Sequence, residues 1–201
     1  MHRLLAVLVA SVLSTSAVPA SGGSDDDVVR RLSVRFDETN VYGRSCREAV
    51  SRNLEMGDAA IHFQYSVSGA PEPGSTRYTG HVRFSLGEIV ITMPRAIAWA
   101  NMAPADRVRT DTLLGAIRHH EIGHVRVAEA LRDELNVREP IAAADQFAFH
   151  AKADAVGREG FARFEHDERE YDRITDHGRR QNLAPGVLAG PDTAIACAVP
   201  R

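Results

Sequence analysis

The first half of the chain alternates apolar and polar residues with the period of two that is typical of β-strands. One such stretch covers residues 32–36, a second 61–67 and a third 82–93, where Gly87-Glu88 interrupts the alternation. We interpret this interruption as a two-residue turn, so the third stretch predicts a hairpin. A capping box that begins at Ser45 predicts a short helix to about Met56. This half is therefore expected to form a small antiparallel sheet with one short helix.

The second half changes to the spacing of about 3.6 residues that amphipathic helices show. Asp111 is expected to cap a helix that reaches about Asn136, and Pro140 to open a second helical stretch to about Ile174. Gly157 and Gly160 are expected to kink or split that stretch, because each costs about 1 kcal/mol relative to alanine. The whole pattern predicts an α+β fold, with the small sheet packed on long helices.

Residues 1–20 have the pattern of a signal peptide: a basic start, an apolar run over residues 4–13, and small residues up to position 20. The run is too short to span a bilayer, which needs about 20 residues; a buried N-terminal helix is the alternative. Residues 21–30 are interpreted as a linker, 31–183 as a single domain and 184–201 as an irregular C-terminal tail. We expect an exported protein, periplasmic or secreted, without stable membrane insertion once the signal is removed.

Charge and cysteine content narrow the class of protein. The 201 residues include 24 Lys and Arg and 27 Asp and Glu, a net charge of −3. No strongly basic surface is expected, so nucleic acid is not a predicted partner. Cys46 and Cys197 could form one disulfide in an oxidising compartment, or remain two buried thiols. Two cysteines cannot form the paired C-x-x-C patterns of cysteine-rich zinc sites, and no pattern indicates an oligomeric state.

The residues most suggestive of chemistry lie within the first long helix, where His120, Glu121 and His124 form an H-E-x-x-H motif. Residues four apart project side by side from a helix, so both imidazoles can bind one zinc ion. Glu121 lies next to His120, where a general base can take a proton from a zinc-activated water. Gly123 predicts that another segment approaches the helix closely there. The alternative is a pair of hydrogen-bonded core histidines without a metal.

A catalytic zinc usually has three protein ligands, so one more is expected. Glu129 lies about 140° around the helix from His124 and points to the wrong side while the helix is continuous. The third ligand must therefore come from another segment. Residues 171–178 offer several candidate side chains: Tyr171, Asp172, Asp176 and His177. The same segment, which ends in a glycine, also suits a helix C-terminal cap.

H-E-x-G-H over 120–124 and Y-D-x-x-T-x-H-G over 171–178 together resemble a bacterial family of exported zinc-dependent proteases, the domain of unknown function 922. The resemblance extends over about residues 32–181 and includes the Y-G-R-S segment at 42–45. It implies a zincin-like hydrolase in which His120 and His124 are zinc ligands and Glu121 is the general base. A tryptophan ahead of the active helix corresponds to Trp99.

The resemblance also implies roles for the second motif. His177 is the expected third zinc ligand, and Asp172 is the second choice. Tyr171 is expected to hydrogen-bond the oxyanion formed during hydrolysis. These assignments complete a predicted site with a Zn²⁺ cofactor and a peptide or protein substrate.

The sequence thus predicts a zinc metallopeptidase. Two alternatives remain at this stage. The protein could be a non-catalytic exported zinc-binding module, whose structural metal is closed by four protein ligands. It could instead be an interaction domain in which the histidine pair is incidental. The alternatives differ in whether zinc binds stoichiometrically and in whether Glu121 is needed.

Overall fold

The computed structural model describes residues 23–41, 45–46, 48 and 57–193 and confirms an α+β fold. Its elements, in chain order, are α1 (Asp25–Arg31), β1 (Arg35–Val41), β2 (Asp58–Pro71), β3 (Tyr78–Ala96), η1 (Trp99–Asn101), α3 (Pro104–Asn136), β4 (Ile141–Ala143), α4 (Gln146–Thr175), η2 (Gln181–Leu183) and η3 (Gly186–Leu188). The predicted signal peptide and Cys197 lie outside the described residues. So does most of the helix predicted from Ser45, although the amide of Glu48 donates to Ser45 Oγ at 3.2 Å, as a capping box requires. Cys46 is buried and disulfide-bonded.

The sheet is mixed rather than antiparallel, which corrects the prediction. β3 is the central strand: it pairs antiparallel with β2 and β4 but parallel with β1. Alternation of apolar and polar residues identifies strands, but it carries no information about the direction in which two strands pair. The first strand also begins later than the alternation indicates, at Arg35, because Leu32 ends the preceding helix.

The interruption at Gly87-Glu88 is a β-bulge, so the hairpin predicted there is wrong. Ile61 pairs with Ile89 and Phe63 with Leu86, which leaves two residues of β3 opposite one residue of β2. The extra residue shifts the alternation, so apolar residues at even positions before it and at odd positions after it face the same side. Phe84, before the bulge, and Ile91, after it, are accordingly both buried. The actual hairpin joins β2 to β3 through residues 72–77.

The helix that carries the H-E-x-x-H motif is longer than predicted. α3 begins at Pro104, because proline suits the first turn of a helix, where its missing N–H is not needed. Asp111 is therefore inside the helix, where its Oδ1 accepts a hydrogen bond from Trp99 Nε1 at 2.9 Å. The helix ends at Asn136, as predicted, and the Asn136 side chain bonds the backbone of Phe84.

α4 runs without a break through Gly157 and Gly160, contrary to the expected kink. A Cβ atom at Gly157 would collide with the ring of Tyr65, and one at Gly160 with the ring of Phe84. The two glycines therefore let the helix approach the aromatic side chains of the sheet. α4 is capped by Asp145, which accepts from the amide of Ala148, and Pro140 precedes β4 instead of opening the helix.

The segment predicted as a linker over residues 21–30 contains α1. Ser24 caps this helix, and Asp25–Asp27 place negative charge in its first turn, where the helix dipole favours it. Val28 is fully buried and packs with Ile122 and Val125 of α3. Val28, with Val29 and Leu32 beside it, thus anchors the segment to the core, and Asp25 adds ion pairs with His119 and Arg126 of α3.

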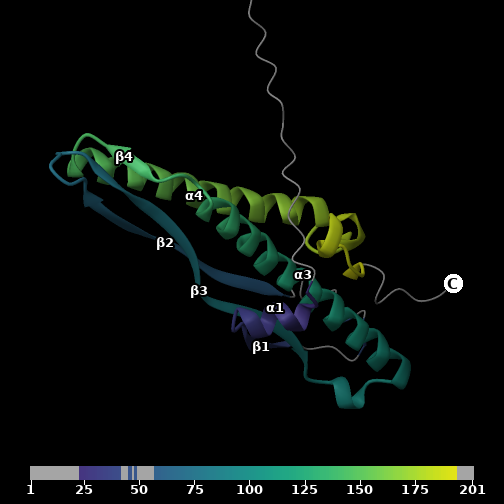
Figure 1. The fold of residues 1–201 in the computed structure, drawn as a ribbon. Helices are drawn as coiled ribbons and strands as arrows, with labels where there is room; N and C mark the ends of the chain where they lie inside the picture. The colour runs from purple at the N-terminus through teal and green to yellow at the C-terminus, as the bar shows by residue number, and fades with distance from the viewer. Residues whose placement is uncertain (1–22, 42–44, 47, 49–56, 194–201) are drawn as a thin grey trace, which may run out of the picture.

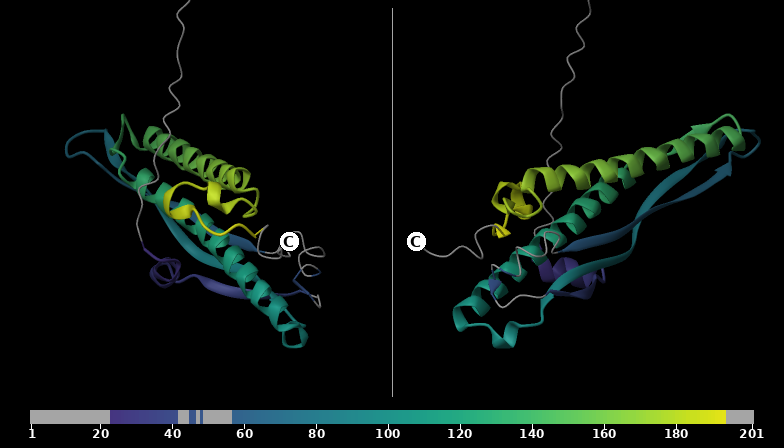
Figure 2. Two further views of the ribbon diagram at one scale, coloured as in Figure 1. Left: turned by 90° about the vertical axis from the view of Figure 1, so that its right-hand side faces the viewer. Right: turned by 180° about the vertical axis from the view of Figure 1, so that it is seen from behind.

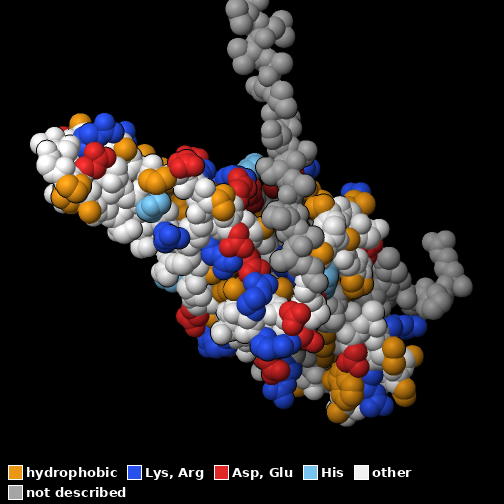
Figure 3. All heavy atoms as spheres, viewed as in Figure 1, with side chains coloured by type: hydrophobic (Ala, Val, Ile, Leu, Met, Phe, Trp, Pro, Cys, Tyr) orange, Lys and Arg blue, Asp and Glu red, His pale blue; other side chains and the backbone are white. Residues whose placement is uncertain are grey.

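α3 and α4 lie on the same face of the long β2–β3 ribbon (Figure 1), and both views in Figure 2 show this layering. Among the described residues, no helix combines the length and apolar character needed to cross a membrane. Basic and acidic side chains are interspersed on the face seen in Figure 3, in keeping with the nearly balanced charge. The arrangement places the motif of α3 beneath the C-terminal end of α4.

Candidate metal centre

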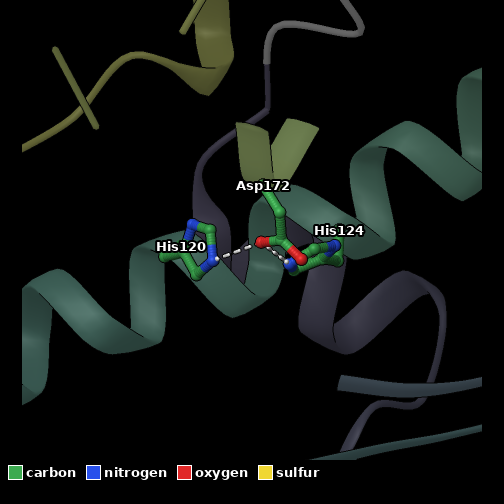
Figure 4. Close-up of side chains that lie close together, drawn as sticks. All are labelled: His120, His124 and Asp172. Carbon is green, nitrogen blue, oxygen red and sulfur yellow. Dashed lines mark ion pairs between the residues drawn. The ribbon is translucent and has the colours of Figure 1, made fainter. Parts of the chain in front are cut away.

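The side chains of His120 and His124 on α3 and of Asp172 on α4 lie close together (Figure 4). α3 presents His120 and His124 one turn apart, with ring centroids separated by 4.9 Å. Asp172 reaches between them from the last turns of α4, and its Oδ1 lies 3.2 Å from Nε2 of each ring. The three residues, here called the metal cluster, each offer one ligand atom within 4.8 Å of the others.

Each histidine of the metal cluster has a partner on its other ring nitrogen. His124 Nδ1 lies 2.8 Å from Glu168 Oε2, and His120 Nδ1 lies 3.0 Å from Gln181 Oε1. Such partners are typical of metal-binding histidines, because they orient the ring and leave the opposite nitrogen for the ion. Sequence reasoning missed both residues. Glu168 could have been found, since it lies four residues before Asp172 and therefore on the same face of α4.

The electrostatics of the cluster favour positive charge. Burial alone would raise the pKa of Asp172, but the adjacent His120 and His124 rings hold that pKa well below its usual range. Burial alone would lower the pKa of His124, but Asp172 and Glu168 raise it to about 10. The carboxylates thus stabilise a cation at this point, whether a proton or a metal ion.

Glu121 lies beside the metal cluster and not within it. Its side chain is buried, and burial raises the pKa of its carboxyl group. The carboxylate packs against the residue before β2: a Cβ atom at Gly57 would collide with Glu121 Oε1. Glycine at that position therefore leaves the space that the carboxylate occupies.

Tyr171 is buried behind His120, with the two rings stacked at 5.1 Å. Its hydroxyl donates to the backbone oxygen of His120 at 3.3 Å and accepts from Gln181 Nε2 at 2.7 Å. A Cβ atom at Gly123 would collide with this hydroxyl, so Tyr171 is the group whose close approach Gly123 predicted. The hydroxyl is thus engaged against α3 in this structure, and its contact with an oxyanion stays a prediction.

The second motif contributes Asp172 to the cluster, whereas His177 lies at its margin. α4 ends at Thr175, and Asp176, His177 and Gly178 all have positive φ angles, of 49°, 50° and 79°. This backbone turns His177 outward, so its side chain is 77% exposed, with Nδ1 3.5 Å from Asp172 Oδ1. Asp176 faces Arg179 instead. Trp99 lies in η1, bonded to Asp111 as described above.

The residues present fit a metal ion. Asp172 Oδ1 is buried and, among the described residues, accepts no hydrogen bond of acceptable geometry, although two ring nitrogens lie near it. Two imidazoles and a carboxylate are donors that zinc takes in proteins. The cluster thus has the composition of a three-ligand zinc centre.

The fold and this cluster define an α+β protein with an H-E-x-x-H helix and, from a second helix, a carboxylate that lies between the two histidines. Residues 38–178 match the model of a family described as a bacterial protein of unknown function (DUF922). The chain belongs to this family. No curated protein and no solved structure matches the chain. The matched residues include the whole metal cluster but end before Gln181.

Proposed function

We propose that this protein is a zinc-dependent metallopeptidase, with His120, His124 and Asp172 as the metal ligands and Glu121 as the general base. The observation that carries the proposal is the position of Asp172 Oδ1, which lies 3.2 Å from both Nε2 atoms without a hydrogen bond among the described residues. A buried carboxylate oxygen that accepts no well-aligned hydrogen bond is unfavourable, even with two ring nitrogens near it. A cation at the centre of the three atoms removes that cost.

The spacing suits zinc in particular. Two atoms that each lie about 2.0–2.1 Å from a tetrahedral zinc are about 3.3 Å from each other. The distances of 3.2 Å from Asp172 Oδ1 to the two histidine nitrogens agree with that value. Three protein ligands leave one tetrahedral position for water or substrate, as catalytic zinc sites require.

A zinc ion held here supplies Lewis acidity, which makes water an effective nucleophile near neutral pH. Glu121, buried and next to His120 in the chain, would accept a proton from the attacking water and return it to the departing amine of the peptide bond. Burial raises the pKa of Glu121, which suits a group that must hold a proton and release it within one cycle. Glu168 keeps the ring of His124 in place throughout.

The proposed substrate is a peptide or protein. Export to the periplasm or out of the cell is part of the proposal and is supported by the signal-peptide pattern of residues 1–20. A non-catalytic zinc-binding module would use the same three ligands. It would differ in not depending on Glu121, so this residue decides between the two functions.

The experiment combines metal analysis of the purified protein with hydrolysis of a mixed peptide library. We expect one zinc per chain and hydrolysis by the wild type. Glu139→Gln, the same substitution at an exposed position, is the control and should also hydrolyse the library. Glu121→Gln should bind zinc but lose about 10²–10⁴-fold in activity, the usual contribution of a general base. Equal activity of the wild type and Glu121→Gln, or a zinc-loaded wild type without activity, would contradict catalysis. Absence of stoichiometric zinc would favour an interaction domain.

A further inference from the structure

Gln181 is a fully buried polar side chain on η2, three residues beyond the end of the family match. Both ends of its amide have hydrogen-bonding partners. Its Oε1 lies 3.0 Å from His120 Nδ1, and its Nε2 donates to Tyr171 Oη at 2.7 Å and to the backbone oxygen of Leu188 at 2.5 Å. The C-terminal segment thus places one satisfied amide directly against a proposed metal ligand.

The contact with Leu188 fixes the orientation of this amide. A backbone carbonyl oxygen can only accept a hydrogen bond, so the NH₂ group of Gln181 must face Leu188. The amide oxygen must then face His120, and because that oxygen can also only accept, the hydrogen lies on His120 Nδ1. A neutral His120 ring therefore has its lone pair on Nε2, the atom that lies 3.2 Å from Asp172 Oδ1.

We propose that Gln181 is a positioning residue of the metal centre, which holds His120 in the orientation and tautomer that present Nε2 to the ion. This inference rests on the proposed metal site. Gln181 sets the tautomer of His120 by bonding its Nδ1. It also supports the orientation of the ring, because it bonds Tyr171, whose ring stacks against that of His120. The ring therefore cannot turn away from Asp172 without breaking a buried hydrogen bond.

Zinc affinity measured by competition with a chelator tests the role. Gln181→Leu removes both hydrogen-bonding groups and should weaken zinc binding about 10–100-fold, as loss of an outer partner of a metal ligand usually does. Gln181→Glu keeps an acceptor toward His120 Nδ1 but loses both donors, so it should bind zinc more tightly than Gln181→Leu and less tightly than the wild type. Gln64→Leu, the same change at an exposed position of β2, should bind zinc like the wild type. Unchanged affinity in Gln181→Leu, or an equal loss in the Leu and Glu variants, would overturn the inference.

A second measurement needs no variant at position 181. Long-range ¹H–¹⁵N spectra of the zinc-loaded wild type show which nitrogen of His120 carries the hydrogen. We expect it on Nδ1, and a hydrogen on Nε2 would overturn the proposal. Neither measurement uses peptide hydrolysis. A protein that binds zinc as described but cleaves no peptide would contradict the proposed enzyme and leave the role of Gln181 standing, whereas a protein that binds no zinc would overturn both.

Discussion

The two long helices meet at two places that are built from opposite kinds of side chain. At the apolar end, Leu135 of α3 and Phe161 and Phe164 of α4 pack with Phe63 and Phe84 of the sheet. The rings of Phe63 and Phe164 stack in parallel at 4.7 Å. At the polar end, the same helices meet through four polar residues, and Gln181 of η2 bonds one of them: His120, His124, Glu168 and Asp172.

The apolar end contributes to the stability of the fold, whereas the polar end holds the side chains suited to chemistry. The apolar end needs no partner beyond the protein, because burial of aromatic surface is favourable in itself. The polar end buries carboxylate and imidazole groups, which is unfavourable unless hydrogen bonds or a cation compensate. The apolar end can thus hold the helices together while the polar end keeps an arrangement suited to an ion.

The largest effect is expected from breaking the apolar end. Phe84→Ala removes a buried ring that contacts both Phe63 and Gly160, and should lower the free energy of unfolding by about 3–5 kcal/mol. Chemical denaturation of the metal-free protein measures the change. Val137→Ala, at a position 83% exposed, is the control and should change stability little. A small loss in Phe84→Ala would show that the apolar end does not dominate the stability of the fold.

An intermediate effect on stability is expected when zinc binds at the polar end. Zinc at 100 times its dissociation constant should raise the free energy of unfolding by about 2.7 kcal/mol, because it binds the folded state. Denaturation with zinc and with a chelator measures the shift. In Asp172→Ala the shift should largely disappear, because one of three ligands is lost. A shift of equal size in that variant would place the stabilising zinc elsewhere.

A smaller effect is expected from the residue behind His124. Glu168→Gln replaces a charged acceptor with a neutral one and should weaken zinc binding about 10–100-fold, or about 1.4–2.7 kcal/mol. Chelator competition measures the affinity. Glu165→Gln removes the same charge three residues earlier on α4, where the side chain is exposed, and should leave affinity unchanged. Equal affinities in the two variants would argue against a role for Glu168.

The part of the site that depends on one helix could be predicted from sequence. His120 and His124 are four residues apart, and helix geometry alone places them together. The third partner depends on how α4 packs across α3, and no local pattern in the sequence specifies that packing. For that reason spacing alone could not show that Asp172, and not His177, lies between the two rings. No sequence pattern indicated a role for Gln181, because its contacts depend on how the C-terminal segment folds back onto the helices.

The fold shows the same division. Alternation and helical spacing identified most of the strands and both long helices, because those patterns report which face is buried. The bulge at Gly87-Glu88 was misread because a turn and an extra residue both interrupt alternation. Gly157 and Gly160 were misread because their effect depends on aromatic rings from another element, Tyr65 and Phe84.

Because Gln181 bonds His120, the candidate site includes residues beyond the end of the family match. A fragment that stops at Gly178, where the family match ends, would keep the H-E-x-x-H helix and the carboxylate above it. It would nevertheless lack the amide that fixes one imidazole, together with the carbonyl of Leu188 that orients that amide. The portion of the chain that the proposed zinc site needs therefore extends at least to Leu188.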